Sequence, residues 1–166
     1  MNTRCLHSVG IDVGTTTTQV IFSALEVTNR APVNQVPRYE FSTREILFKS
    51  PVIFTPLTPD RSVDVGDLIR FIDAQYAAAG LTRKQIESGA IIITGETSKT
   101  RNARAAVMEV SSQLGDFVVA TAGPHLESVI AGRGSGAGEY SRENARRVLN
   151  IDIGGGTSNY AVFAGG

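Results

Sequence analysis

The sequence is poor in the residues that cross-link a chain or anchor it in a membrane. It has one cysteine, Cys5, among 166 residues, so by itself it can form neither an internal disulfide nor a cysteine-rich zinc or iron–sulfur site. A reducing, cytoplasmic setting is therefore the default expectation. No stretch approaches the roughly 18 apolar residues of a membrane-spanning helix. Residues 1–10 also lack the apolar core of a secretory signal.

An excess of charge of one sign is absent as well. Sixteen Lys and Arg balance sixteen Asp and Glu, which argues against a protein that binds nucleic acid through bulk positive charge. With 42% hydrophobic and 19% charged residues, the composition is typical of a packed globular chain of about one domain. Glycine is what the sequence has in quantity: there are 17, and nine of them lie from Gly132 onward.

The order of strand and helix patterns predicts an α/β fold with a mixed sheet. Two β-branched, apolar runs at residues 7–13 and 17–25 flank a Gly-Thr-Thr turn, which indicates a hairpin. Beyond it we expect extended segments at 38–49 and 52–55, helices at 66–79, 101–114 and 124–131, a short helix at 82–89, and buried strands at 90–94 and 117–120.

The glycine-rich stretch suggests where the chain divides. Residues 132–138 alternate Gly with Arg, Ser and Ala, and we expect them to form a flexible connector. A short helix from Ser141 and a strand pair at 148–153 and 158–163 should follow. The predicted organisation is a first domain over 1–131, a connector over 132–140 and the start of a second, similar domain over 141–166.

Two distant segments share one pattern. Residues 11–19, IDVGTTTTQ, align without a gap on residues 151–159, IDIGGGTSN, at a constant offset of 140. Each copy has an aspartate between apolar residues, then a glycine, two small residues, two hydroxyl side chains and an amide. A repeat of this kind predicts two related units that each begin with the same hairpin.

The shared pattern favours phosphate and metal binding. Glycine lets backbone N–H groups approach an anion closely, and threonine and serine hydroxyls add further donors. A carboxylate and a phosphate repel each other unless a cation lies between them, and Mg²⁺ takes oxygen ligands. One copy alone is more often a structural turn, whereas two in register point to a site. The candidate phosphate-binding residues are Gly14, Thr15, Thr16, Thr17, Gly154, Gly155, Gly156 and Thr157, and the candidate metal residues are Asp12 and Asp152.

The other motifs carry less functional information. Residues 94–100, TGETSKT, have no glycine immediately before Lys99 and so lack a Walker A pattern. We expect a strand-to-helix loop there, with Glu96 as a weak candidate for a catalytic role. His7 and His125 have no partner at metal-ligand spacing.

The two hairpins resemble the first and second phosphate motifs of the superfamily that joins actin, sugar kinases and heat-shock chaperone ATPases. Residues 9–18, 93–99, 121–137 and 151–159 are more specifically similar to the ethanolamine ammonia-lyase reactivating factors. The resemblance implies an actin-like ATPase (ribonuclease H-like) fold and a chaperone-like factor that depends on ATP and Mg²⁺. Such a factor exchanges damaged cobalamin on ethanolamine ammonia-lyase for intact adenosylcobalamin, in the cytoplasm or a bacterial microcompartment.

The resemblance covers the whole chain but only the N-terminal part of such a factor. Its adenine-binding motif and most of its second domain would lie beyond residue 166. We therefore expect ATPase activity from a full-length protein, and weak or absent nucleotide binding by these residues alone. The partners it implies are ethanolamine ammonia-lyase and a nucleotide, with neither nucleic acid nor membrane.

Two alternatives within the same superfamily remain open. A small-molecule kinase would need a carboxylate base beside a substrate hydroxyl, and no distinctive sugar-site pattern is present. An actin-like assembly ATPase would use nucleotide to set polymerisation, which sedimentation with ATP would detect. The dehydratase activators of the superfamily carry a cysteine-ligated cluster, which the single Cys5 does not favour.

Overall fold

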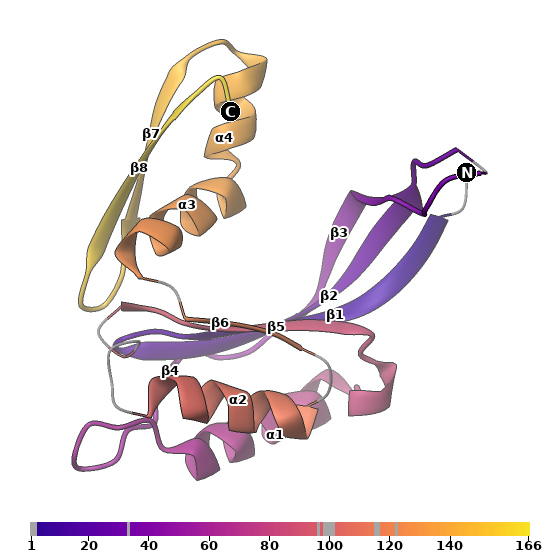
Figure 1. Ribbon diagram of the computed structural model, residues 1–166. Helices are drawn as coiled ribbons and strands as arrows, with labels where there is room; N and C mark the ends of the chain where they lie inside the picture. Colours follow the sequence, from indigo (N-terminus) through magenta and orange to yellow (C-terminus); the bar gives the residue numbers. More distant parts are fainter. Residues whose placement is uncertain (1–2, 33, 96, 98–101, 115–116, 122) are drawn as a thin grey trace.

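A mixed β-sheet organises the first part of the chain (Figure 1). The structure is a computed structural model that describes residues 3–32, 34–95, 97, 102–114, 117–121 and 123–166. The strand order is β3-β2-β1-β5-β6, and β4 pairs with β2. β1 runs antiparallel to β2 and parallel to β5, as the predicted mixed sheet requires. The strands are β1 Thr3–Val13, β2 Thr17–Asn29, β3 Tyr39–Lys49, β4 Ile53–Phe54, β5 Ser88–Ile93 and β6 Phe117–Thr121.

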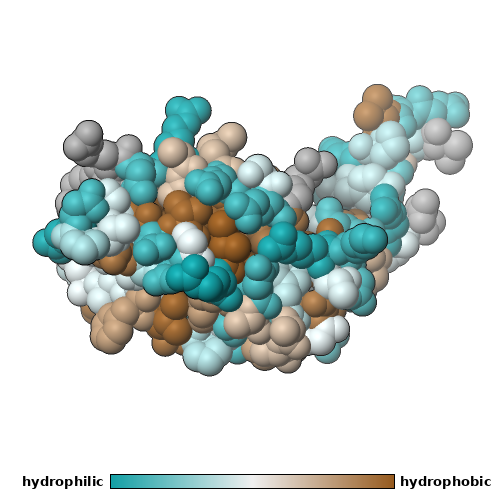
Figure 2. All heavy atoms as spheres, turned by 90° about the horizontal axis from the view of Figure 1, so that it is seen from below, coloured by the Kyte–Doolittle hydropathy of each residue, from teal (hydrophilic) through white to brown (hydrophobic). Residues whose placement is uncertain are grey.

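Two helices, α1 (Val65–Ala79) and α2 (Ala103–Leu114), cover one face of this sheet (Figure 1). Leu68, Ile72 and Tyr76 of α1 recur at helical spacing and are buried against the sheet. The Tyr76 ring meets Phe22 of β2 edge-on, with the ring centroids 4.8 Å apart. α1 ends where Gly80 takes a φ of 66°, a conformation that glycine adopts at little cost. Figure 2 shows the outside of this layer, where hydrophobic residues lie among hydrophilic ones.

Neither α1 nor α2 covers the opposite face of the sheet. Along β1, Val9 and Ile11 point into the core while Gly10 and Asp12 are exposed, as strand alternation dictates. β5 follows the same alternation, with Ala90 exposed. The prediction of buried strands at 90–94 and 117–120 was therefore wrong for one face of the sheet, where Val118 of β6 is also exposed. A continuous apolar run does not reveal that only one side is covered.

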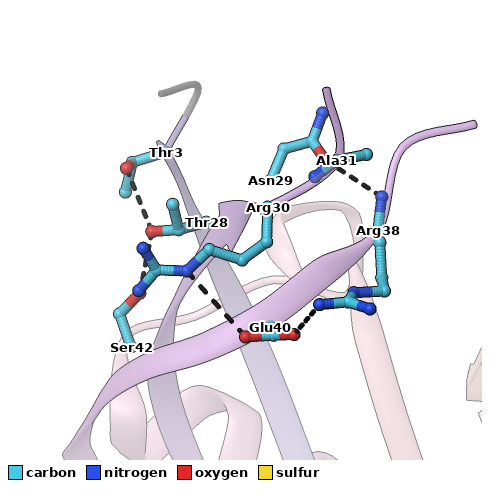
Figure 3. A network of polar contacts seen from close by, with 8 residues as sticks. All are labelled: Thr3, Thr28, Asn29, Arg30, Ala31, Arg38, Glu40 and Ser42. Atoms are coloured by element: carbon cyan, nitrogen blue, oxygen red, sulfur yellow. Dashed lines mark hydrogen bonds and ion pairs between the residues drawn. The ribbon is translucent and has the colours of Figure 1, made fainter. Parts of the chain in front are cut away.

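Three strands extend past the rest of the sheet as an arm, made of residues 3–7, 24–29 and 39–46 (Figure 1). β5 begins to pair with β1 only at Ser8, so the arm has three strands. Polar contacts hold its tip (Figure 3). The Glu40 carboxylate pairs with Arg38 at 2.8 Å, and Asn29 Oδ1 accepts hydrogen bonds from the backbone N–H groups of Ala31 and Arg38, each at 2.9 Å.

A second, smaller unit follows the sheet. It contains α3 (Pro124–Gly134), α4 (Ala137–Glu143) and an antiparallel hairpin of β7 (Arg147–Ile153) and β8 (Ser158–Ala164). α3 begins at the predicted proline but continues to Gly134, and α4 begins before Ser141. Most of the glycine-rich stretch at 132–138 is therefore helical, and the prediction of a flexible connector was wrong.

Close packing explains two of those glycines. Gly132 and Gly138 are buried beneath Phe163 of β8, and a Cβ on Gly132 would lie 2.3 Å from the Phe163 ring. These glycines let two helices approach the hairpin, so they serve packing where composition alone suggested flexibility.

The remaining differences from the sequence expectations are local. The short helix predicted at 82–89 is a single 3₁₀ turn, η1 (Arg83–Gln85), because β5 starts at Ser88. Thr100 and Arg101, the expected cap and first residue of α2, lie outside the described residues. No helix in the described part of the chain is long and apolar enough to cross a membrane.

A pair of alanine substitutions on α3 tests the packing role of glycine. We expect Gly132→Ala to lower the free energy of unfolding by about 1–3 kcal/mol, because the new Cβ overlaps Phe163. Gly134→Ala, where a Cβ would meet nothing within 4 Å, should be neutral or stabilising by up to about 1 kcal/mol. Urea unfolding measures both, and equal effects would contradict the packing account.

Candidate functional site

The turns of the two repeated hairpins are closed by the same backbone hydrogen bond. In the first loop (residues 14–17) the Gly14 N–H donates to the Thr17 carbonyl at 2.9 Å, and in the second loop (residues 154–157) Gly154 donates to Thr157 at the same distance. The strand register agrees too, since Asp12 lies opposite Gln19 and Asp152 opposite Asn159. The predicted structural equivalence of the hairpins is confirmed.

The two loops lie against each other. A Cβ on Gly155 would be 2.6 Å from the Cβ of Thr16, and a Cβ on Gly156 would be 3.0 Å from Thr15 Cγ2. The threonines of the first loop therefore pack on the glycines of the second, and no larger residue fits at Gly155 without displacement. The fold thus brings together two candidate loops that are 140 residues apart in the sequence.

Hydroxyl groups fix the shape of the first loop. Thr55 Oγ1 donates to the Gly14 carbonyl at 2.8 Å, and Thr97 Oγ1 donates to the same oxygen at 3.1 Å. Thr55 also contacts Thr18 at 3.0 Å, and all three threonines are buried. The loop is therefore anchored to β2, to the segment after β4 and to the segment after β5, a rigidity that favours a binding site.

Backbone donors are available on both loops. The N–H groups of Thr16, Gly155 and Gly156 donate no hydrogen bond to any described residue. Successive unpaired N–H groups in a tight turn form a concave site for an anion. The contact between the loops puts donors of both within reach of one polyphosphate.

Carboxylates gather beside the loops. The pKa of Asp12 is raised to about 6, first by desolvation from the surrounding strands and loops, and then by the negative charges of Glu127 and Asp152. A hydrogen bond from Thr94 offsets part of this rise. Although neighbouring atoms desolvate the carboxylate, the Asp12 residue is exposed to solvent overall, so a ligand can reach it. The raised pKa identifies a position at which a bound cation would reduce the repulsion between neighbouring carboxylates.

Glu127 is the site residue that sequence reasoning missed. It lies in the first turn of α3, where its Oε2 accepts a hydrogen bond from the Gly95 N–H at 3.2 Å. Gly95 has a φ of 60° in the segment after β5. The available signal was an acidic residue opening a helix after a parallel strand, the edge at which α/β proteins bind ligands.

The carboxylates beside the loops fit a hydrated cation better than one bound directly by several protein side chains. In the described ranges no three His, Cys, Asp or Glu side chains are close enough together to hold a metal ion. Mg²⁺ usually keeps several waters and takes one or two carboxylates together with phosphate oxygens. Asp12 and Asp152 suit that arrangement. Glu96, the weak catalytic candidate, lies outside the described residues.

Comparison with known proteins gives one family and two curated relatives. The model of the family "Ethanolamine utilisation protein EutA" matches residues 4–166. Proteins named ethanolamine ammonia-lyase reactivase EutA, from Salmonella typhimurium and Escherichia coli, are each 64% identical to the chain over 166 residues. The match covers all of this chain and 36% of each relative, so the chain spans about a third of their length.

Solved structures share the fold at low identity. A Ppx/GppA family member from Aquifex aeolicus has a TM-score of 0.61 and 18% identity, covering 98% of this chain and 48% of that one. A nucleoside triphosphate hydrolase structure from Neospora caninum has a TM-score of 0.53 and 12% identity, covering 95% and 35%. The predicted α/β fold, an actin-like fold with a mixed sheet and the hairpin of a second unit, is confirmed.

The raised pKa of Asp12 predicts a pH-dependent stability. The folded state holds this proton more tightly than the unfolded chain, whose aspartate pKa is 3.8. The resulting stabilisation should be complete below about pH 4 and be lost as the pH rises through about 6. We expect Asp12→Asn to flatten this part of the profile, and Glu127→Gln to move the loss to lower pH.

Urea unfolding between pH 4 and 7 measures this effect. Glu143→Gln, at an exposed position on α4, serves as the control and should follow the parent profile. Parallel curves for the parent and Asp12→Asn would show that Asp12 titrates normally.

Proposed function

We propose a function from the premise that this chain belongs to the EutA family of ethanolamine utilisation proteins. In this proposal the chain forms the phosphate-binding part of an ATP- and Mg²⁺-dependent factor that reactivates ethanolamine ammonia-lyase. The curated relatives bear the name of that activity. The observation that carries the nucleotide part is the contact between the two repeated loops, whose unpaired N–H groups and neighbouring carboxylates are the donor set for a magnesium–polyphosphate.

Backbone donors do the phosphate binding in this proposal. The N–H groups of Thr16, Gly155 and Gly156 hydrogen-bond the phosphate oxygens, and the Thr15 and Thr157 hydroxyls assist. A chain whose formal net charge is zero can bind a polyanion in this way without a basic patch, because partial charges of rigid amides act at short range.

The carboxylates set the place of the cation. Asp12 and Asp152 would hold Mg²⁺, and the ion would offset the repulsion between carboxylates and phosphates. Desolvation and the neighbouring Glu127 and Asp152 raise the pKa of Asp12 to about 6 before any cation binds. Cation binding therefore releases the proton from any protonated Asp12.

Glu127 orients the attacking water. Gly95 fixes one of its oxygens, Oε2, by a hydrogen bond of 3.2 Å, and Oε1 accepts none from a described residue. The free oxygen can accept a proton from a water molecule placed near the terminal phosphate. Positioning of water by a carboxylate or amide side chain is a recurring part of phosphoryl transfer to water.

Hydrolysis can be coupled to the partner because the site is built from both units. The first loop belongs to the large sheet, whereas the second loop and Glu127 belong to the small unit. Loss of the terminal phosphate removes a ligand that holds them together, and the units move apart. We propose that this motion loosens the lyase so that damaged cobalamin leaves and intact adenosylcobalamin enters.

Substitutions in a chain as long as the curated relatives test the proposal. We expect Asp12→Ala and Asp152→Ala each to abolish Mg²⁺-dependent ATP hydrolysis. Glu127→Gln should lower kcat by about 10²–10⁴-fold with little change in KM, because it removes a proton acceptor and leaves binding intact. Phosphate release and reactivation of cyanocobalamin-inhibited ethanolamine ammonia-lyase are the measurements.

The matched control is Glu143→Gln, which should retain full hydrolysis and reactivation. Normal turnover by Asp12→Ala would remove Asp12 from the site. ATP turnover that required an added small-molecule acceptor would identify a kinase instead.

A further inference from the structure

The segment after β5 contacts both candidate loops. Figure 1 shows the end of β5 beside the turn of the β7–β8 hairpin, and the packing around Gly95 agrees with that placement. Thr97 Oγ1 donates to the Gly14 carbonyl of the first loop at 3.1 Å, and the Thr94 side chain hydrogen-bonds Asp12. Thr94 and Thr97 therefore fix the segment to the first loop and to the end of β1.

Gly95 lies between those two threonines and meets three parts of the site. Its N–H donates to Glu127 Oε2 on α3 at 3.2 Å. A Cβ on Gly95 would overlap Thr15 Oγ1 of the first loop and would lie 3.8 Å from Thr157 Oγ1 of the second. One backbone position is therefore next to the first loop, the second loop and the carboxylate assigned above to the attacking water.

Both the backbone and the available space require glycine at this position. The φ of Gly95 is 60°, in the left-handed region that is unfavourable for residues with a Cβ. Gly80, which ends α1, has a φ of 66°, but a Cβ there would meet nothing within 4 Å. The two glycines share the backbone requirement, and Gly95 has the requirement for space in addition.

Phosphate binding and water orientation depend on different backbone groups. The N–H groups proposed to bind phosphate belong to the two loops, whereas the N–H of Gly95 fixes Glu127. A side chain at position 95 would displace the segment from Thr15, and the hydrogen bond to Glu127 would lengthen with it. A misplacement of about 1 Å can lower a rate by roughly 10²-fold, so the expected defect is in turnover and not in affinity.

We propose that Gly95 is a positioning residue, which holds the Glu127 carboxylate at a fixed place relative to both loops through its hydrogen bond and its close packing on Thr15. This inference rests on the proposed hydrolysis of ATP and adds the element that relates the water to the phosphate-binding loops. Gly95 follows β5 of the large sheet, whereas Glu127 belongs to α3 of the small unit. The water is therefore oriented only while the two units are together.

Steady-state hydrolysis of Mg²⁺–ATP by a chain as long as the curated relatives tests this role. We expect Gly95→Ala to lower kcat by about 10–10²-fold and to change KM by less than about threefold, because the loops keep their donors. Gly80→Ala is the matched control for the left-handed backbone, and it should retain the parent kcat because its Cβ has open space.

A second substitution separates positioning from a general loss of structure. Thr15→Ala removes the hydroxyl that the new Cβ overlaps and leaves the Cβ of residue 15 at 3.4 Å from it. We expect the double variant Gly95→Ala/Thr15→Ala to reach a kcat within about threefold of Thr15→Ala alone. If Gly95→Ala does not fold, Glu127→Asp replaces it: the shorter side chain keeps its charge but cannot reach the Gly95 N–H, so kcat should fall by at least about tenfold.

The outcomes distinguish this inference from the function on which it rests. An active parent with an unchanged kcat in Gly95→Ala, or in Glu127→Asp, would overturn the positioning role and leave the proposed hydrolysis standing. A loss in Gly95→Ala that Thr15→Ala does not relieve would overturn it too. A parent chain that hydrolyses no ATP would contradict the proposed function itself, and the positioning role with it.

Discussion

The contact between the threonines of the first loop and the glycines of the second is the constraint on which the rest of the site depends. A Cβ on Gly155 would be 2.6 Å from Thr16 and one on Gly156 would be 3.0 Å from Thr15, so these two glycines let the two loops pack together. That approach brings Asp152 and Glu127 of the small unit near Asp12 of the large sheet. Neither unit alone carries all of the unpaired backbone N–H groups and carboxylates of the candidate site. The site is therefore a property of the pair, and whatever separates the units dismantles it.

The electrostatics follow from the same approach. At the end of β1, local desolvation and then the negative charges of Glu127 and Asp152 raise the pKa of Asp12 to about 6. Carboxylates gathered in this way are unfavourable in isolation and are relieved by a cation. In the proposed function, the backbone N–H groups of both loops then bind the phosphate oxygens. A neutral chain can bind a polyanion by this route, since the attraction comes from local dipoles and a metal ion and not from net charge.

Local patterns predicted most of the elements, and tertiary packing decided the rest. The hairpins, α1, α2 and the start of α3 follow from periodicity, capping and the repeat, which are encoded within a few residues. The connector prediction failed because glycine signals flexibility in a composition, whereas Gly132 and Gly138 are small to admit Phe163. Glu127 was missed because its role comes from Gly95 and Asp12, which are distant in sequence. The candidate loop residues themselves were predictable, because the repeat places the same pattern twice.

The central claim is that both loops bind one magnesium–polyphosphate together. Paramagnetic broadening of amide NMR signals by Mn²⁺–ATP measures this directly, since Mn²⁺ replaces Mg²⁺ at oxygen sites. In a chain as long as the curated relatives and at saturating Mn²⁺–ATP, the account predicts comparable broadening at residues 14–17 and 154–157, with little change for the diamagnetic Mg²⁺–ATP control. Broadening confined to residues 14–17, with the amides of 154–157 unaffected, would contradict it.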